Sequence, residues 1–447
     1  MTKFPELFEG KFDDDFSCAI DAIVASIDRG DPVEYGTISS IVKNFQSKGE
    51  FDKAEIILLK SFARNNKDIR IIIDTGSNFS LKKDYDSAIE WFSVAEKLNP
   101  RNSWPYFLKS KIYRKSGRSV DALNILSKGL NIAGNKIIRS EFNNMIKEYC
   151  DLKAIIAEGQ GIVSREAISM PADCGREVKG ALQVSLVKNE GDIIYANLSH
   201  SYFVGIRNFV IGNNASTDTT IDEINRFKID YPNAVVFVVD DPVVGYHQAA
   251  KTTALARFGK TIFDGIGREI EWIFPLDGDE FLRFVPQAGD LLNFLSSDVV
   301  TGKKVIAYHW MHAFSSDIHD TIDPNCPLEN YFFRFSGFGP TPVRKIAFRA
   351  TFDAYLEIGN HYVDGVIDNP SDLVVAAEHG LVLGHYPVRS VSQIKSKIIN
   401  GAMALIAGNI STQYGGHWRK EYERYLAIGD MHFHDMVKKY NDNHANI

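Results

Sequence analysis

Cysteine is scarce in this sequence of 447 residues, which contains only four. The four are scattered, without a Cys-x-x-Cys pair, which argues against a zinc knuckle and against the disulfide framework of a small secreted domain. Reduced thiols are therefore expected. We predict a cytoplasmic protein, and peripheral association with the inner membrane is an open alternative.

Long apolar runs and an excess of positive charge are missing as well. No stretch reaches the roughly 18 to 20 apolar residues that cross a bilayer, so we expect no transmembrane segment. The formal net charge of −7 gives no general attraction to nucleic acid, which is not an expected partner. The first residues also lack the basic start and apolar core of a signal peptide.

Two glycine-rich phosphate-binding motifs are absent too. There is no Gly-x-Gly-x-x-Gly after the first predicted strand and no Gly-x-x-x-x-Gly-Lys-Ser/Thr loop, which argues against a dinucleotide-binding dehydrogenase and a P-loop enzyme. The composition that remains, 45% hydrophobic and 24% charged, is that of an ordinary globular protein. A chain of this length should divide into two or three domains.

The first third of the sequence contains an internal repeat. The segments Phe51-Asp-Lys-Ala54, Tyr85-Asp-Ser-Ala88 and Ser119-Val-Asp-Ala122 follow one another at intervals of 34 residues. This period is the signature of tetratricopeptide repeats. The sequence resembles such repeats over about residues 35 to 134, and we predict an all-α, tetratricopeptide-like helical repeat domain over residues 1–150.

Tetratricopeptide arrays commonly bind peptides or partner proteins, so the resemblance implies a protein partner for this domain. Two alternatives to partner binding, self-association and simple packing against the next domain, have equal weight. We predict a linker over residues 151–178, because Pro171 and Gly175 interrupt the helical pattern there.

From Ala181 onward the pattern changes to alternating strands and helices. This order predicts an open, Rossmann-like, mostly parallel sheet flanked by helices, an α/β fold over residues 179–447 with further helices at the C-terminus. The predicted strands are 182–187, 208–212, 234–239 and 272–276, and the predicted helices between them are 192–205, 217–230 and 248–258.

Polar residues follow all four predicted strands. They are Lys188-Asn-Glu190, Asn213 to Asp218, Asp240-Asp241 and Asp277-Gly-Asp279. Ligands of open α/β sheets bind at this carboxyl edge. Two carboxylates on a glycine turn can converge on one divalent cation, although Asp-Gly is also ordinary turn chemistry after a buried strand.

Three of these segments together carry a resemblance to a known family. Val184 to Glu190, Asn213 to Asp218 and Pro275 to Phe281 resemble glycosyltransferases of the GT-A fold, specifically family-two-like enzymes of bacterial surface polysaccharide synthesis. Trp310 to His319 is similar to the acceptor-side segment of that group and of the related family ninety-two, and His385 to Ser390, with Gln393 and Lys397, is similar to its closing motif. The resemblance extends to about residue 400.

The resemblance implies roles for residues that follow the strands. Glu190 and Asp218 would line the nucleotide pocket, and Asp240 or Asp241 would meet the uracil or ribose, since carboxylates accept hydrogen bonds from base N–H groups and sugar hydroxyls. Lys345 would assist the phosphates. A helix cap is the alternative role of Asp218, and ordinary turn, loop or surface positions are the alternatives for the others.

The resemblance also implies a divalent cation. Asp277 and Asp279 would hold Mn²⁺ or Mg²⁺ against the donor diphosphate, with His385 as a third protein ligand. The cation would offset the charge that builds on the departing nucleoside diphosphate. A structural hydrogen bond is the alternative role of His385.

An inverting transfer further needs a general base that takes the proton of the acceptor hydroxyl. Glu280, Asp364 and Glu378 are the candidates. Strand alternation turns Glu280 away from the acidic pair, and the other two are candidates by position alone. Trp310, in the segment similar to the acceptor side, is available to stack on a sugar face.

We therefore predict a metal-dependent glycosyltransferase of the hexosyltransferase type. It would move a sugar from a nucleotide-sugar donor, expected to be a UDP-sugar, to a glycan or lipid-linked acceptor in surface polysaccharide or glycoconjugate synthesis. A nucleotidyltransferase with the same acids and metal is the second hypothesis, and a non-catalytic interaction protein built on the repeats is the third.

Overall fold

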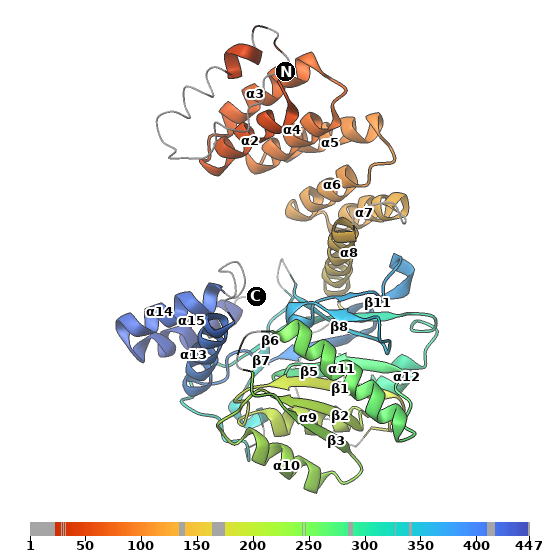
Figure 1. Cartoon of the computed structure of the whole chain (residues 1–447), viewed down its shortest axis with the longest axis vertical. Helices are drawn as coiled ribbons and strands as arrows, with labels where there is room; N and C mark the ends of the chain where they lie inside the picture. Colours follow the sequence, from red (N-terminus) through yellow and green to blue (C-terminus); the bar gives the residue numbers. More distant parts are fainter. Residues whose placement is uncertain are drawn as a thin grey trace. The chain divides into compact units, whose positions relative to one another are not determined.

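The computed structural model describes residues 23–133, 139–162, 175–243, 247–284, 289–326, 328–338, 342–408 and 416–445, together with Gly245 and without residues 28, 30 and 32. The chain divides into two compact units, Met1–Leu152 and Lys153–Ile447. Figure 1 labels the helices and strands of both units.

The first unit is a series of helix pairs followed by one longer helix. The pairs are α2 (Tyr35–Ser47) with α3 (Phe51–Arg64), α4 (Ile69–Leu81) with α5 (Tyr85–Leu98) and α6 (Trp104–Lys115) with α7 (Ser119–Ala133), and α8 (Arg139–Gly159) follows. The second helices of the pairs begin at residues 51, 85 and 119, so the 34-residue period of the sequence is the period of the pairs. The predicted tetratricopeptide-like repeat is confirmed.

Small side chains let the paired helices approach closely. Ala54, Ala88 and Ala122, which recur at the repeat period, are all fully buried. Gly76 on α4 lies so close to Phe92 on α5 that a Cβ at residue 76 would come within 2.7 Å of the ring. Packing between helices, rather than helix propensity alone, therefore stabilises the repeats.

The division between the two units falls inside α8, which continues to Gly159 and so enters the stretch predicted to be a linker. Residues 163–174 of that predicted linker lie outside the described residues.

The second unit begins with the parallel sheet that the sequence predicts. The strands β1 (Ala181–Val187), β2 (Asn208–Asn213), β3 (Val235–Asp240) and β4 (Trp272–Pro275) run parallel in the order β3-β2-β1-β4. The helices between them are α9 (Ile194–Phe203), α10 (Thr220–Asp230) and α11 (Gln248–Gly265). Nearly every residue of β1 and β2 is buried, as expected for parallel strands covered on both faces.

Helices cover both faces of this part of the sheet. Phe209 of β2 packs edge-on against Phe227 of α10, with ring centroids 5.4 Å apart. Gly212 of the same strand faces Leu255 of α11, whose Cδ1 would lie 2.6 Å from an added Cβ. Because residues of opposite parity in a strand point to opposite faces, α10 and α11 lie on opposite sides of the sheet.

Beyond β4 the sheet becomes mixed. It continues through β8 (Arg344–Arg349), β6 (Val305–Phe314), β12 (Leu381–His385) and β5 (Glu280–Phe284), in the order β4-β8-β6-β12-β5. β8 is antiparallel to both β4 and β6, and β5 is antiparallel to β12, whereas β12 is parallel to β6. Two short strands, β7 (Arg334–Phe335) and β11 (Leu373–Val375), also pair with β6. The remaining elements are the short helix α12 (Leu291–Leu295) and a separate two-stranded sheet of β9 (Tyr355–Leu356) and β10 (Val363–Asp364).

The link between β4 and β5 forces the sheet to curve. The two strands are joined by only four residues, 276–279, yet β8, β6 and β12 lie between them in the sheet. In a flat sheet four strand spacings would span about 19 Å. Residues 275 to 280 reach about 18 Å when fully extended, and a turn reaches less. The sheet therefore curls, and the link crosses its concave side.

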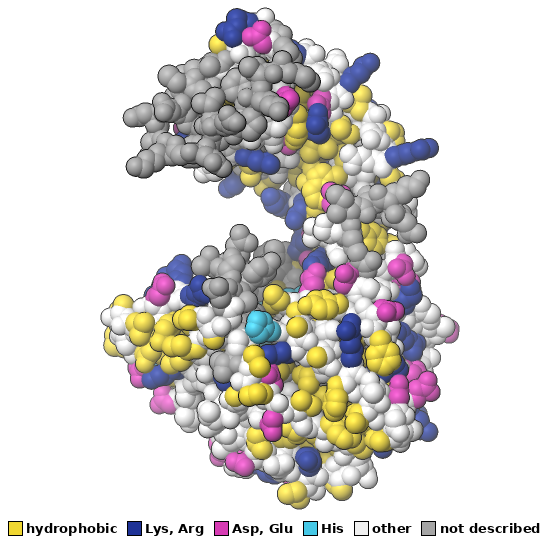
Figure 2. All heavy atoms as spheres, in the orientation of Figure 1, with side chains coloured by type: hydrophobic (Ala, Val, Ile, Leu, Met, Phe, Trp, Pro, Cys, Tyr) yellow, Lys and Arg dark blue, Asp and Glu magenta, His cyan; other side chains and the backbone are white. Residues whose placement is uncertain are grey.

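Three helices complete the second unit, namely α13 (Val391–Ala407), α14 (Gly416–Ile428) and α15 (Met431–Ala445). A small core in which Ile394 and Ile398 of α13 meet Phe433 and Val437 of α15 holds them together. Apolar side chains also gather on the surface over α14 and α15, as Figure 2 shows.

The predicted fold class is confirmed, because a helical repeat precedes a mixed α/β unit with a mostly parallel sheet flanked by helices. The antiparallel strands beyond β4 were not predicted. None of the helices that the structure describes has both the length and the apolarity needed to span a membrane.

Candidate functional site

A cleft of about 220 Å³ lies at the carboxyl ends of β1, β2 and β4, the edge at which the sequence predicts ligand binding. One wall is formed by Asp277-Gly-Asp279, here called the acid turn, together with residues 186–190 after and within β1. Helix α13 forms the opposite wall. It contributes Gln393, Ser396, Lys397, Asn400, Gly401 and Ala404.

Asp279 is the centre of a dense cluster of two cationic side chains and one imidazole. Its Oδ2 lies 2.8 Å from Nζ of Lys397, 3.6 Å from Nε2 of His385 and 3.7 Å from a guanidinium nitrogen of Arg389. Burial alone would raise the pKa of the Asp279 carboxyl, but Lys397, His385 and Arg389 outweigh it and hold the pKa well below its ordinary value. Asp279 is therefore an anion at neutral pH.

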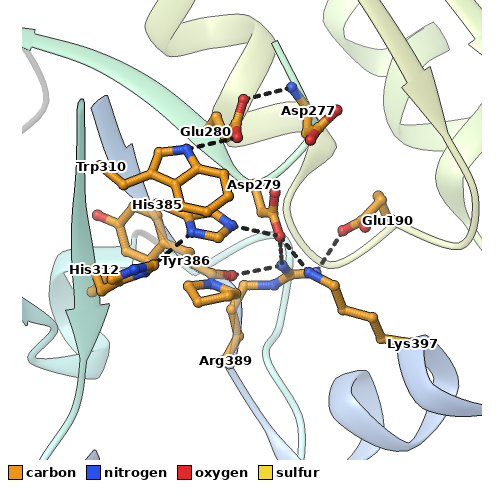
Figure 3. A network of polar contacts seen from close by, with 12 residues as sticks. Glu190, Asp277, Asp279, Glu280, Trp310, His312, His385, Tyr386, Arg389 and Lys397 are labelled. Atoms are coloured by element: carbon orange, nitrogen blue, oxygen red, sulfur yellow. Dashed lines mark hydrogen bonds and ion pairs between the residues drawn. The ribbon is translucent and has the colours of Figure 1, made fainter. Parts of the chain in front are cut away.

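Asp277 turns to a different set of partners. Its Oδ2 accepts a hydrogen bond of 2.6 Å from Nζ of Lys345, on β8, and its Oδ1 lies 3.3 Å from the side-chain amide of Asn360. In Figure 3 the Asp279 carboxylate points toward Arg389 and Lys397, whereas Asp277 lies on the side of Glu280. The glycine between the two acids thus separates them instead of aiming both at one point.

The spacing of Asp279 and His385 suits a divalent cation, which would take the place of Lys397 at Oδ2 of Asp279. Their facing atoms are 3.6 Å apart, which suits two ligands that each approach one ion to about 2.1 Å. Asp277 is not brought to the same point, and among the described residues no three His, Cys, Asp or Glu side chains converge. A carboxylate, an imidazole and two oxygens of a bound diphosphate would make a normal ligand set for Mn²⁺ or Mg²⁺.

Glu280 is buried behind the acid turn, in a network with two other side chains. Its Oε1 lies 2.9 Å from Nζ of Lys345 and accepts a hydrogen bond of the same length from Nε1 of Trp310. Its Oε2 accepts from the backbone N–H of Asp277. Burial raises the pKa of the Glu280 carboxyl, an effect that Lys345 opposes. Since Glu280 is fully enclosed, it supports the acid turn and does not reach an acceptor hydroxyl.

Lys345, predicted to assist the phosphates, is enclosed in the same network. It is only 1% exposed. Of its two close partners, Asp277 lines the cleft, whereas Glu280 is buried behind the acid turn. Burial would lower the pKa of the Lys345 ammonium, but the two carboxylates outweigh burial and raise it, so Lys345 stays charged. Lys345 would therefore act on a ligand in the cleft indirectly, by way of its ion pair with Asp277.

Arg389 ties the closing motif to the loop after β1. Its guanidinium is fully buried and donates to both carboxylate oxygens of Asp192, at 2.8 Å each, and to Glu190 at 2.6 Å. Burial raises the pKa of Glu190 to about 7, against the opposing effect of Arg389. Glu190 lines the cleft as predicted, and Arg389 fixes its direction.

The other predicted nucleotide ligands do not line the cleft. Asp218 accepts hydrogen bonds from the backbone N–H groups of Thr220, the first residue of α10, and of Gly191, whereas the N-cap residue of that helix is Thr219. Asp240 accepts from Asn213, and Asp241 pairs with Lys251 at 2.6 Å.

The two remaining candidates for the general base also lie away from the cleft. Asp364 pairs with Tyr355 in the two-stranded sheet of β9 and β10. Glu378 pairs with Lys153 at 2.7 Å and precedes Leu381, the first residue of β12, whereas His385 ends that strand. Neither residue lines the cleft.

Sequence reasoning named Lys188 after the first strand and Lys397 with the closing motif but gave neither a role, and it missed Lys251, another lysine of the cleft. Lys188 donates to the carbonyl oxygens of residues 214 and 215, and burial together with Lys251 lowers the pKa of its ammonium. A signal for the α13 wall exists in the sequence. Polar Gln393, Lys397 and Asn400 recur at the spacing of one helix face.

No family model matches this chain, and no curated protein matches it. Solved structures that are similar to part of it include the type III secretion chaperone SycD of Yersinia enterocolitica in complex with a peptide of the translocator YopD, with 16% identity, coverage of 27% of this chain and 93% of that chain, and a TM-score of 0.25. The Sgt2 TPR domain from Aspergillus fumigatus gives 15% identity, coverage of 31% and 90%, and a TM-score of 0.26.

Proposed function

We propose that this chain is a glycosyltransferase of the GT-A type, which moves a sugar from a nucleoside-diphosphate sugar, expected to be a UDP-sugar, to a glycan or lipid-linked acceptor. The observation that carries the proposal is the position of Asp279 in the cleft wall, next to His385 and Lys397. An anion beside an imidazole and an ammonium suits a site for a metal-bound diphosphate.

The lysines of the cleft suit the binding of the donor. Lys188, Lys251 and Lys397 all line the cleft. Their ammonium groups are bound to protein oxygens and would exchange these partners for, or share them with, phosphate oxygens. Glu190, held by Arg389, has the acceptor oxygens that a ribose or base would need. When bound at Asp279 and His385, Mn²⁺ or Mg²⁺ would neutralise the leaving diphosphate.

We further propose that the repeats bind a protein partner or a second copy of the chain. Apolar side chains are exposed on the second helices of the repeats, among them Ile56, Leu59 and Val94, which are 52%, 38% and 37% exposed. Apolar area that a repeat leaves in solvent favours a protein contact. Size-exclusion chromatography with light scattering would separate self-association from a monomer that needs another partner.

Product analysis tests the proposed reaction. The purified protein is incubated with a panel of nucleotide-sugars, with Mn²⁺ or with EDTA, and the released nucleotide is identified. We expect nucleoside diphosphate with Mn²⁺ and little or none with EDTA. Release of pyrophosphate would support a nucleotidyltransferase instead, and no release from any donor, even with acceptor glycans added, would contradict the proposal.

A further inference from the structure

His385 is held by two aromatic neighbours on the adjacent strand. The indole of Trp310 stacks on its imidazole, with centroids 4.1 Å apart and an interplanar angle of 23°. On the other side, Nδ1 of His385 lies 3.2 Å from Nδ1 of His312. Figure 3 shows His385 between these two residues, with its second nitrogen toward Asp279.

Strand register explains why the three rings meet. β12 pairs in parallel with β6, with Leu383 opposite Trp310 and His385 opposite His312. Trp310 and His312 are two residues apart on β6, so their side chains point to the same face of the sheet. His385 projects from the neighbouring strand to that face and enters the space between them. The sheet therefore presets the direction of the imidazole.

The contact between the two Nδ1 atoms restricts the tautomer of His385. A hydrogen bond between two ring nitrogens needs a proton on one of them and a lone pair on the other. One arrangement puts the proton on Nδ1 of His312, so that an Nε2–H of His385 faces the Asp279 carboxylate at 3.6 Å. Only the other arrangement leaves Nε2 of His385 able to bind a cation. A proton on Nδ1 of His385, donated to His312, satisfies the close contact and leaves Nε2 with a free lone pair.

The ring of His312 is itself confined. His444 of α15 lies against it, with ring centroids 5.1 Å apart, and Nδ1 of His444 makes its own hydrogen bond of 2.9 Å to the carbonyl of Tyr440. Tyr440 in turn donates to the carbonyl of Ala313 on β6. Helix α15 thus packs behind His312 and keeps its Nδ1 toward His385.

We propose that His312 is a positioning residue, which accepts the Nδ1 proton of His385 and thereby keeps Nε2 of His385 free to bind the divalent cation beside Asp279. This inference rests on the proposed function, since it concerns the cation of the same site. The geometry also gives Trp310 a role other than the predicted sugar stacking. One face of its indole is covered by His385, and its N–H is donated to Glu280.

Two substitutions at residue 312 separate positioning from packing. His312→Asn keeps a hydrogen-bond acceptor at the position of Nδ1, whereas His312→Leu removes it. Binding of Mn²⁺ to the full chain is measured by electron paramagnetic resonance, without donor or turnover. We expect His312→Leu to weaken Mn²⁺ binding by about 10- to 100-fold, as losing the partner of a ligating histidine commonly does, and His312→Asn to recover most of the loss. The control His319→Leu changes a histidine of the same segment that contacts Tyr331 instead, and it should bind Mn²⁺ normally.

A second readout is independent of the metal. In ¹⁵N-histidine spectra of the metal-free protein, the signals of His385, assigned by their loss in His385→Gln, should show the Nδ1–H tautomer, and His312→Leu should shift the ring toward Nε2–H. The Nε2–H tautomer in the unmodified protein, or normal Mn²⁺ affinity in a folded His312→Leu, would overturn this inference alone. An unmodified protein with the Nδ1–H tautomer but no Mn²⁺ affinity would count against the metal of the proposed function.

Discussion

Lys397 donates to Oδ2 of Asp279 over 2.8 Å, and this contact joins helix α13 to the acid turn. The pair spans the cleft between its two walls. Burial would lower the pKa of the Lys397 ammonium, but Asp279 and Glu190 outweigh burial and raise it, so the lysine brings a full positive charge. A bound diphosphate would meet a cation already present in the cleft.

Replacement of Lys397 should therefore weaken the binding of donor. We expect Lys397→Met to lose about 1.5–3 kcal/mol of binding free energy for a nucleoside diphosphate, or about 10- to 150-fold in Kd, because a charged hydrogen bond is lost. Isothermal titration calorimetry measures the change. The control is Lys395→Met on the same helix, which breaks only an exposed pair with Asp430 and should change Kd by less than about fivefold. Equal effects of the two variants would contradict the role of Lys397.

Asp279 should be indispensable to turnover. Asp279→Asn keeps the size of the side chain but removes its charge, so we expect the release of nucleoside diphosphate to fall by at least about 100-fold. Asp240→Asn is the matched control, because that acid is exposed and lies outside the cleft. Turnover by Asp279→Asn close to that of the unmodified enzyme would remove the acid turn from the reaction.

Arg389 should be the most sensitive residue of the second unit for stability. Arg389→Met leaves Glu190 and Asp192 without their buried partner, and we expect a loss of about 3–5 kcal/mol in the free energy of unfolding of that unit. Hydrogen exchange of the β1 and β2 amides measures it. Arg424→Met, which breaks only an exposed pair with Glu421, should change the same free energy by less than about 0.5 kcal/mol.

The loss of stability caused by Arg389→Met should also depend on pH. Burial raises the pKa of Glu190 to about 7, and Arg389 opposes that rise, so its removal would raise the pKa further. The attraction between Arg389 and ionised Glu190 exists above this pKa and is lost as the pH falls through it. We expect a smaller difference in stability between the two proteins at pH 6 than at pH 8. A deficit that grows on acidification would contradict this account.

The repeats offer a stability test that does not involve the site. Gly76→Val would press a side chain into the ring of Phe92, since even a Cβ would lie within 2.7 Å of it, and overpacking of this kind costs about 1–3 kcal/mol. Gly36→Val is the control, because an added Cβ at residue 36 has nothing within 4 Å. Hydrogen exchange of α4 and α5 should respond to the first change and not to the second.

Much of the fold could be predicted because its signals are local. The repeated alanines at intervals of 34 residues mark tight helix packing, and alternation of strands and helices from Ala181 marks the parallel half of the sheet. The later strands could not be predicted in the same way. Several of them, such as β7, β9 and β10, have only two residues, too few for any periodic pattern.

The site was predicted where a motif and a strand end coincide, as for Glu190 and Asp279. Prediction failed where the outcome depends on packing between distant segments. Glu378 pairs with Lys153, which lies 225 residues earlier in the sequence, and no local sequence pattern predicts such a pair. The directions of Asp277 and Asp279 were likewise set by Lys345 and Lys397, which come from β8 and α13.

The four residues between β4 and β5 also have a mechanical role, because they join two strands of the curved sheet and form a turn in which the N–H of Glu280 donates to the carbonyl of Asp277. A deletion there would pull β5 along β12 and move Glu280 away from its place opposite His385. Strand geometry therefore limits how short this link can be, and the turn that carries the two acids depends on that length.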